Sequence, residues 1–313
     1  MKKVILITGA SSGFGLHTAQ LLASRGHHVY GTRLPHEDFQ DERFHVLPLD
    51  VTDVESVQVC VQTVIAAQRR IDVLVNNAGI ILLGAVEETT LDEAARVFDV
   101  NFFGAARMIQ AVLPFMRAQR SGTILNVTSL AGLIGAPYQG YYAASKHALE
   151  GLTESLVYEL RPFNIHLALI EPGIARTPLA RHKLIARQPL TAYDGVRDRV
   201  IARWEHFTRI GVPASAVAAA VCRAVETDPP PLRQTIGVEA LRGAFAKRLL
   251  PFSSLENGVS EALHVVEPRH IGQRQMWRAL RVLPALGLIG VWLWRKLARM
   301  NDVERVGGGK QAP

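Results

Sequence analysis

A glycine-rich loop near the N-terminus constrains most strongly how this chain can fold. Residues 4–7 form a short apolar run typical of a strand, the loop at 8–15 follows it directly, and a helix is predicted over 16–24. Glycines in the loop permit a tight turn and a close approach of backbone N–H groups to a phosphate, and the N-terminus of the helix favours an anion. The order of strand, glycine loop and helix predicts a pyrophosphate site.

Strands and helices alternate after this loop. Further apolar runs typical of strands lie at residues 28–32, 72–75, 123–127 and 165–170. Two Thr-x-x-Glu capping boxes, at Thr52 and Thr90, each predict that a helix begins directly after the threonine. We therefore expect an α/β fold, a Rossmann-type doubly wound parallel sheet with helices on both faces. Residues 1–266 are expected to form one domain that includes a substrate loop at 178–211, followed by a C-terminal helical tail at 267–313.

The sequence places a phenol, an ammonium and a hydroxyl at spacings that suit proton transfer. Tyr142 and Lys146 are four residues apart in a helical pattern and share one helix face. A free tyrosine has a pKa of roughly 10, which a nearby ammonium lowers, so Tyr142 is a candidate general acid/base. Ser129 follows the strand at 123–127, and we expect its hydroxyl at the carboxyl edge of the sheet, where α/β folds bind ligands.

Four motifs together resemble the classical short-chain dehydrogenase/reductase family over about the first 240 residues. They are Thr8-Gly9-Ala10-Ser11-Ser12-Gly13-Phe14-Gly15, Asn76-Asn77-Ala78-Gly79, Ser129, and Tyr142-x-x-x-Lys146. Within that family the sequence resembles steroid- and retinol-dehydrogenase-like members. The resemblance implies an NAD(P)-dependent oxidoreductase acting on CH–OH donors. It also implies a catalytic set of Asn101, Ser129, Tyr142 and Lys146. In that set the serine binds the substrate oxygen, the tyrosine exchanges its proton, the lysine holds the nicotinamide ribose, and the asparagine maintains a water relay.

The same resemblance implies the cofactor site. Its residues are Gly9, Ser11, Ser12, Gly13, Phe14, Gly15, Arg33, Asp50, Val51, Asn77, Ala78, Gly79, Tyr142, Lys146, Pro172, Gly173, Ile174 and Thr177. Phe14 stands where the family usually has Ile or Leu, so local packing is expected to differ. No acid appears after the second strand before Glu37, whereas Arg33 is placed to bind a 2′-phosphate. NADP(H) is the expected cofactor, with NAD(H) as the alternative.

Cysteine usage and charge exclude several classes. Cys60 and Cys222 both fall in helical patterns, and the eleven histidines show no ligand spacing, so we expect no disulfide, no metal and a cytoplasmic catalytic domain. From Arg269 onward there are nine basic and two acidic residues, which account for the whole net charge of +7. The body is therefore formally neutral, and a nucleic-acid surface is not expected.

The tail at 267–313 lies outside the resemblance and combines apolar, aromatic and basic residues. Residues 282–294 carry no charge, and as a helix they would span about 20 Å against a hydrocarbon core of roughly 30 Å. Trp277, Trp292 and Trp294 with flanking cations predict a peripheral anchor at a membrane surface. The alternative is a helix that packs on the body or on a second subunit.

The predicted function is NADP(H)-dependent interconversion of a carbonyl and a secondary alcohol by hydride transfer. The anchor favours a lipophilic substrate, with steroids, retinoids and long-chain acyl compounds or ketones as the leading classes. Val196, Val200, Trp204 and Phe207, at helical spacing, form either a wall of the substrate cleft or a helix packed on the core.

Two other functional classes stay open. One is a regulator or scaffold that binds the cofactor without turnover. The other is an epimerase or dehydratase of the extended relatives, whose glycine spacing differs from that at the start of this chain. The resemblance also implies a homodimer or homotetramer assembled through helices at 91–117 and 141–160.

Overall fold

A seven-stranded parallel sheet organises the computed structural model, which describes residues 2–177, 179 and 183–265. Its order is β11-β7-β6-β4-β1-β2-β3, and every neighbouring pair is parallel. The strands are β1 (Val4–Ile7), β2 (His28–Arg33), β3 (His45–Pro48), β4 (Val73–Asn76), β6 (Gly122–Val127), β7 (Ile165–Pro172) and β11 (Arg233–Ile236). The chain order reverses direction across the β1–β4 pair, so the predicted Rossmann-type doubly wound sheet is confirmed.

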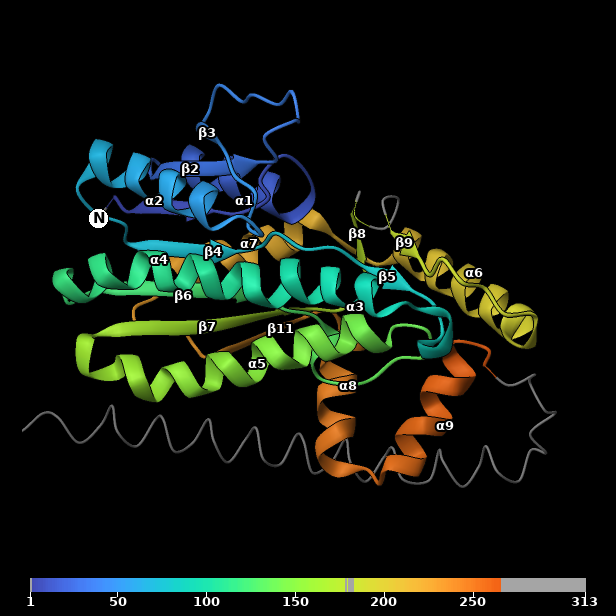
Figure 1. Ribbon diagram of the computed structural model, residues 1–313. Helices are drawn as coiled ribbons and strands as arrows, with labels where there is room; N and C mark the ends of the chain where they lie inside the picture. Colours follow the sequence, from blue (N-terminus) through green and yellow to red (C-terminus); the bar gives the residue numbers. More distant parts are fainter. Residues whose placement is uncertain (1, 178, 180–182, 266–313) are drawn as a thin grey trace, which may run out of the picture. The chain divides into compact units, whose positions relative to one another are not determined.

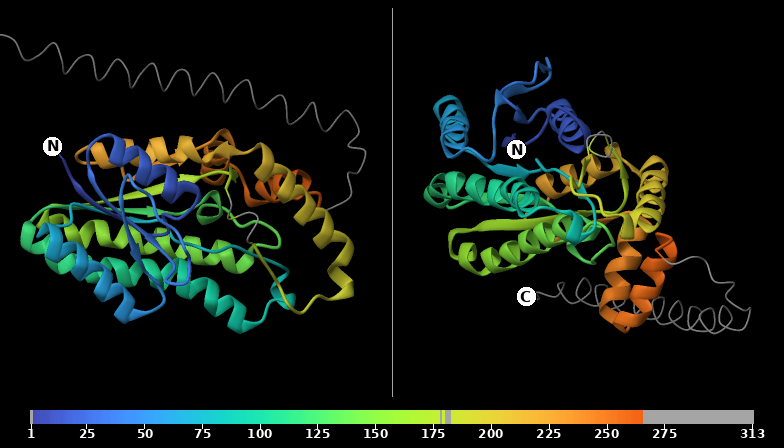
Figure 2. Two further views of the ribbon diagram at one scale, coloured as in Figure 1. Left: turned by 90° about the horizontal axis from the view of Figure 1, so that it is seen from above. Right: turned by 45° about the vertical axis from the view of Figure 1, so that its right-hand side comes forward.

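Helices cover both faces of the sheet (Figure 1, Figure 2). One core holds residues of α2 (Val54–Gln68), α4 (Gly104–Gln119) and α5 (Gly140–Leu160), and the other holds residues of α1 (Gly13–Ser24) and α7 (Ala214–Glu226). In β1, Leu6 belongs to the first core while Ile5 and Ile7 belong to the second. Successive strand side chains point to opposite faces, so a strand buried on both sides is apolar throughout.

Of the two predicted capping boxes, one is confirmed and one is wrong. The capping box at Thr90 is confirmed, because its hydroxyl accepts from the Glu93 N–H at 3.2 Å and the Glu93 carboxylate accepts from the Thr90 N–H at 3.0 Å. The box at Thr52 is wrong. The Thr52 hydroxyl donates to Asp50, and Asp53 caps α2 instead.

The predicted helix at 91–117 is interrupted. It comprises α3 (Leu91–Phe98), a π-helical segment η2 (Asp99–Phe103) and α4. A π segment adds a residue to one turn and is frequent at functional sites. Here it carries Asn101.

Smaller elements gather beyond the carboxyl ends of the strands. They are β5 (Leu82–Leu83) paired with β9 (Leu184–Ile185), β8 (Ala175–Arg176) paired with β10 (Val212–Pro213), the 3₁₀ turns η1 (Val86–Glu88), η3 (Leu130–Gly132) and η6 (Thr191–Tyr193), and helix α6 (Asp194–Ile210). A further 3₁₀ turn, η4 (Arg161–Phe163), joins α5 to the start of β7 at the opposite edge of the sheet. After β11 the chain forms two more helices, α8 (Val238–Leu249) and α9 (Phe252–Ala262), which were not predicted from sequence (Figure 1).

The tail predicted at 267–313 lies outside the described residues, so the domain boundaries and the anchor stay predictions. Within the described part of the chain, no helix is both long enough and apolar enough to cross a bilayer.

Candidate active site

The glycine loop has the shape that a close backbone approach requires. Gly9 and Gly13 have φ of +67° and +55°, in the left-handed region that favours glycine. A Cβ atom on Gly15 would lie 2.1 Å from the carbonyl oxygen of Gly9, so no other residue fits there. Ser12 is the N-cap of α1, but its side chain makes no capping hydrogen bond. The start of α1 is therefore well suited to bind a phosphate of a dinucleotide.

The segment from Asn76 to Gly79 holds the glycine loop in place. The Asn77 amide donates from Nδ2 to the carbonyl oxygens of Thr8 and Gly9, both at 2.9 Å. The Thr8 hydroxyl in turn accepts from the backbone N–H groups of Asn77 and Ala78, at 3.0 and 2.9 Å. Sequence reasoning assigned Asn77 and Ala78 to the cofactor; the structure shows that they brace the loop.

Arg33 ends β2 with a guanidinium that its own loop fixes. Nη1 donates to the carbonyl oxygens of Leu34 and Pro35, both at 2.9 Å. Nε is buried and has no hydrogen-bond partner among the described residues. A buried donor without a partner is costly, so this nitrogen suits a ligand acceptor such as a phosphate oxygen.

The other predicted adenine contacts, Asp50 and Val51, are partly engaged within the protein. Oδ1 of Asp50 accepts from the N–H and the hydroxyl of Thr52, at 2.9 and 2.7 Å. The side chain of Val51 is 7% exposed and lies in the core, where a Cβ atom on Gly104 would come within 2.7 Å of it. Val51 could therefore meet an adenine only through its backbone.

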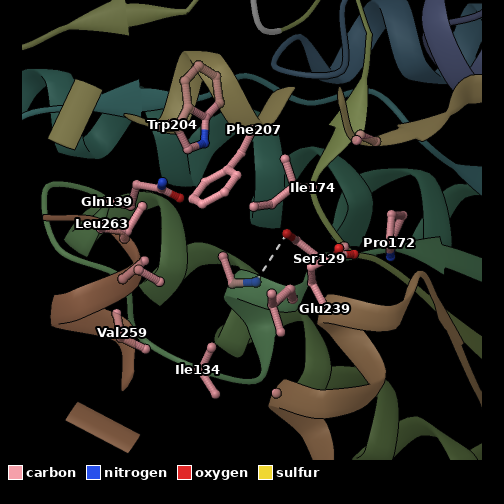
Figure 3. Close-up of a pocket in the computed structure, with 18 of the residues that line it drawn as sticks. Ser129, Ile134, Gln139, Pro172, Ile174, Trp204, Phe207, Glu239, Val259 and Leu263 are labelled. Atoms are coloured by element: carbon pink, nitrogen blue, oxygen red, sulfur yellow. Dashed lines mark hydrogen bonds between the residues drawn. The ribbon is translucent and has the colours of Figure 1, made fainter. Parts of the chain in front are cut away.

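Ser129 and Tyr142 meet at the carboxyl edge of the sheet. Ser129 follows β6 as the N-cap of η3, and its hydroxyl accepts from the Ala131 N–H at 3.1 Å (Figure 3). Tyr142 lies in the first turn of α5, and its phenol lies near enough to the Ser129 hydroxyl for that hydroxyl to influence its pKa. The structure thus brings together two groups thirteen residues apart in the sequence, as the predicted chemistry requires.

Lys146 and Asn101 converge beside Gly79. The Lys146 ammonium is buried and donates to the carbonyl oxygen of Val127 at 3.0 Å. A Cβ atom on Gly79 would lie 3.1 Å from Oδ1 of Asn101 and 3.6 Å from Nζ of Lys146. A glycine at position 79 therefore leaves room for both side chains to approach the end of β4.

Both polar atoms of the Asn101 side-chain amide form hydrogen bonds with protein groups. Oδ1 accepts from the Ile80 N–H at 2.8 Å, and Nδ2 donates to the Ile80 carbonyl at 3.0 Å and to the Ser145 hydroxyl at 3.1 Å. Its side chain consequently joins η2 to the segment after β4 and to α5. This positioning role was not expected from sequence, which gave the residue a water-binding role only.

Burial sets the pKa values of the central pair. It raises the pKa of the Tyr142 phenol, against the opposing effect of the nearby Ser129 hydroxyl. Burial also lowers the pKa of Lys146 to about 8, and the nearby Glu150 carboxylate opposes this shift. The predicted downward shift of the Tyr142 pKa is wrong for this structure. Desolvation of the phenolate dominates, and the ammonium donates to the Val127 carbonyl.

A cavity of about 720 Å³ opens beside Ser129 and Tyr142 (Figure 3). The predicted site residues that line it are Phe14, Ser129, Tyr142, Pro172, Gly173, Ile174 and Thr177. The other predicted residues lie outside it, in the glycine loop, at the end of β2, before α2, and around Gly79. The cavity therefore joins the nicotinamide end of the predicted cofactor site to a space of the size that small-molecule ligands fill.

Helix α6 forms one wall of this cavity. Trp204 and Phe207 line it, whereas Val200 is 2% exposed and does not. Trp204 also packs in a cluster with Tyr142. Trp204 and Phe207 thus form a wall of the cavity, as one interpretation of the helical pattern predicted, whereas Val200 is buried, as the other predicted.

Helices α8 and α9 form the wall that sequence reasoning missed. Their lining residues are Glu239, Arg242, Gly243, Ala246, Ser254, Leu255, Gly258, Val259 and Ala262, with Leu250 and Leu263 at their ends. A usable signal was present, because Ala240, Gly243 and Ala246 recur every three residues. Small residues at that spacing form a helix face that permits close packing.

An ion network ties β11, which leads into α8, to α5. Nη1 of Arg233 donates to Glu150 at 2.6 Å and also to Glu171, and Nη2 donates to Glu154 at 2.5 Å. Glu171 is 1% exposed and directly precedes Pro172 in the cavity wall. The network therefore fixes that loop and the start of the α8 wall relative to α5.

Comparison with known proteins shows the family. A family model described as short chain dehydrogenase matches residues 3–187. A 3-ketodihydrosphingosine reductase of Bacteroides thetaiotaomicron is 42% identical over 238 residues, which cover 75% of this chain and 88% of the relative. Retinol dehydrogenase 8 of Homo sapiens is 33% identical over 303 residues, covering 90% of this chain and 92% of the relative. The chain therefore belongs to the short-chain dehydrogenase family.

Solved structures agree with this assignment. A short-chain dehydrogenase/reductase of Burkholderia phymatum in complex with NAD is 27% identical, with a TM-score of 0.69 over 82% of this chain and 95% of that chain. ElxO with NADP bound is 26% identical, with a TM-score of 0.63 over 77% of this chain and 99% of that chain. These comparisons confirm the predicted family and the predicted NAD(P)-dependent oxidoreductase. They also agree with NADP(H) as the expected cofactor and NAD(H) as the alternative.

One expectation about the tail is corrected. The match to retinol dehydrogenase 8 covers 90% of the chain, a larger share than residues 1–265 of 313 could supply alone. Similarity to this relative therefore extends beyond residue 265, whereas the tail was expected to lie outside it.

Proposed function

We propose that the protein interconverts a carbonyl and a secondary alcohol on a lipophilic substrate, with NADP(H) as its preferred cofactor. The observation that carries this proposal is that Ser129 and Tyr142 both line a largely apolar cavity, which also reaches Phe14 of the glycine loop. The pair supplies an acid and a hydrogen-bond donor at one point, and the cavity supplies a binding space next to it.

Each residue has a stated task in this proposal. The nicotinamide, when bound, supplies or accepts the hydride. Ser129 hydrogen-bonds the substrate oxygen, and Tyr142 gives it a proton or takes one. Because burial raises the pKa of Tyr142, the phenol is neutral near pH 7 and suited to donate its proton during carbonyl reduction. Lys146 holds the nicotinamide ribose, and Asn101 fixes η2 beside it.

Arg33 supports the preference for NADP(H). Its buried Nε has no partner in the part of the chain that the structure describes, and Nη1 is fixed by two carbonyl oxygens. A charged donor held in this way suits the 2′-phosphate, which NAD(H) lacks. The start of α1 and Gly15 would hold the pyrophosphate.

A lipophilic substrate is supported by the cavity walls. Ile134, Ile174, Trp204, Val259 and Leu263 supply apolar side chains from four different segments. The names of the two relatives, a 3-ketodihydrosphingosine reductase and a retinol dehydrogenase, are consistent with a long apolar substrate. Steroid, retinoid and long-chain ketone substrates are the classes we propose.

Purified full-length protein should oxidise NADPH faster with a long-chain ketone than with acetone, because only the former fills the cavity. The loss of absorbance at 340 nm measures the reaction, with NADH tested in parallel. Retinoids and steroids would be tested as further substrates. No turnover with any of these, together with tight NADPH binding, would support the regulator or scaffold instead.

We infer that the protein also contacts a membrane surface, through the predicted tail and through α8. The outer face of α8 presents a stripe of large apolar side chains, each more than half exposed: Val238, Leu241, Phe245 and Leu249. The exposed Arg242 and Arg248 flank this stripe on the helix surface. An apolar stripe bordered by cations matches an anionic lipid surface, and residues of α8 also line the cavity.

Full-length protein should sediment with vesicles that contain phosphatidylserine. Each cation near the surface adds about 1 kcal/mol, so high salt should release only part of the protein. Leu249→Asp and Trp294→Asp should each weaken binding, whereas Val59→Asp, at an exposed valine on α2, should not. Protein that stays in the supernatant at low salt would contradict membrane contact.

Assembly into a homodimer or homotetramer remains part of the proposal. The helical faces implied by the resemblance carry exposed apolar side chains, Phe103 of η2 and Tyr158 of α5. Light scattering of the purified protein would measure its mass directly.

A further inference from the structure

Glu150 is a buried carboxylate to which the proposed reaction gives no task. It lies in α5 and is 5% exposed. Oε2 accepts from Nη1 of Arg233 at 2.6 Å, whereas Oε1 is buried and has no hydrogen-bond partner among the described residues. A Cβ atom on Gly132 would lie 3.3 Å from Oε1, so this oxygen faces η3. The Thr128 hydroxyl lies near enough to influence Glu150, but its single proton goes to the Ile170 carbonyl oxygen at 3.2 Å. A buried carboxylate oxygen without a partner is costly, so the Arg233 contact alone does not explain this position.

Negative charge exceeds positive charge around Arg233. Its guanidinium forms ion pairs with three carboxylates, those of Glu150, Glu171 and Glu154. Two of these side chains are buried, because Glu150 is 5% and Glu171 is 1% exposed. A second buried cation would offset the remaining negative charge. Lys146, one helical turn before Glu150 on the same face of α5, supplies that cation.

The Lys146 ammonium has no ion pair of its own within the described part of the chain. Its only hydrogen bond among these residues is the one that it donates to the Val127 carbonyl oxygen, at 3.0 Å. Burial lowers the pKa of Lys146 to about 8, and the Glu150 carboxylate opposes this shift. The charged form is therefore supported by a carboxylate one helical turn away rather than by a direct contact.

We infer that Glu150 is a positioning residue whose negative charge keeps Lys146 in the ammonium form that holds the nicotinamide ribose. The inference rests on the proposed function, which gives Lys146 this task. An ammonium offers three N–H donors and a positive charge to the ribose hydroxyls, whereas a neutral amine lacks the charge and the third donor. Glu150 does not line the cavity and acts through Lys146.

The effect of Glu150 is confined to alkaline solution. Burial raises the pKa of Glu150, and Glu171 adds to this rise, whereas Arg233 opposes it. At low pH Lys146 is charged whether or not Glu150 is ionised. As the pH rises past about 8 the lysine loses its proton, and the ionised Glu150 delays this loss. The Tyr142 phenol has a pKa raised by burial and stays neutral in this range.

The first test measures the charge of Lys146 without cofactor or substrate. The chain contains seven lysines, so NMR of full-length protein with ¹³C-labelled lysine can follow each side chain, and the Lys146→Met spectrum identifies the signal of Lys146. Glu150→Gln, which can still accept from Arg233, should lower the pH at which this signal titrates by about one unit. Glu154→Gln, at an exposed partner of the same guanidinium, should leave that pH unchanged.

The second test measures the consequence for cofactor binding. In the Tyr142→Phe background, fluorescence titration with NADPH would compare Glu150→Gln with unchanged Glu150 at pH 6 and at pH 9. Affinities should agree within about twofold at pH 6 and differ about tenfold at pH 9, as a one-unit fall of the Lys146 pKa from about 8 requires. Glu150→Asp retains the charge and should restore most of the affinity at pH 9.

The outcomes separate this inference from the proposed reaction. A shifted Lys146 signal with weaker NADPH binding at pH 9 supports the inference even if no carbonyl is reduced. The same titration of Lys146 in wild type and in folded Glu150→Gln would overturn it, and so would equal NADPH affinities at pH 9. Glu150→Met serves as a second neutral variant if the glutamine protein does not fold.

Discussion

Tyr142→Phe should reduce kcat by about 10²- to 10⁴-fold, the range for loss of a positioned general acid. The hydroxyl is the only part of the side chain that the substitution removes, and Tyr142 lines the cavity together with Ser129. The ring would remain in its cluster with Trp204 and Ala143, so the fold should be preserved. Because the loss concerns the transition state, KM and the affinity for NADPH should change little.

Tyr141 provides a matched control for this prediction. It is the preceding residue of α5, is only partly buried, and does not line the cavity. Tyr141→Phe should therefore retain wild-type kcat. Steady-state rates and NADPH fluorescence titrations would be measured for both variants. A near-normal kcat for Tyr142→Phe would remove the phenol from the mechanism.

Arg33→Asp should weaken NADPH binding by about 100-fold or more while changing NADH binding far less. A charge-assisted hydrogen bond contributes about 1.5–3 kcal/mol, and the new carboxylate would also repel the 2′-phosphate. The effect should be specific, because Arg33 makes its described hydrogen bonds only to the neighbouring Leu34 and Pro35 carbonyls. Stability should therefore change little.

His36→Asp is the matched control for this substitution. It adds a negative charge to the same exposed loop but leaves the Arg33 guanidinium in place. Fluorescence titration with both cofactors, together with thermal melting, would compare the two variants. Equal losses of NADPH and NADH affinity in Arg33→Asp would show that this residue does not recognise the phosphate.

The sequence by itself determined the fold and most of the candidate site. Glycines at 9 and 15 are needed for steric reasons that act within a few residues of the chain. Apolar runs at regular intervals, separated by helical patterns, permit few arrangements other than a doubly wound sheet. In such a sheet, residues that directly follow strands meet at one edge. That argument placed Ser129 at the edge, whereas its pairing with Tyr142 came from the family resemblance of the two motifs.

The tertiary structure decided what depends on distant contacts. Distant segments of the chain bury Tyr142, which reversed the expected direction of its pKa shift. The predicted capping box at Thr52 failed for a local reason, because the Thr52 hydroxyl donates to Asp50. Asn101 is satisfied by Ile80 and Ser145, which are distant in sequence. The α8–α9 wall was also not predicted. Which side chain fills a cavity, and which polar atom keeps no partner there, follows only from the packing of segments that local sequence patterns do not relate.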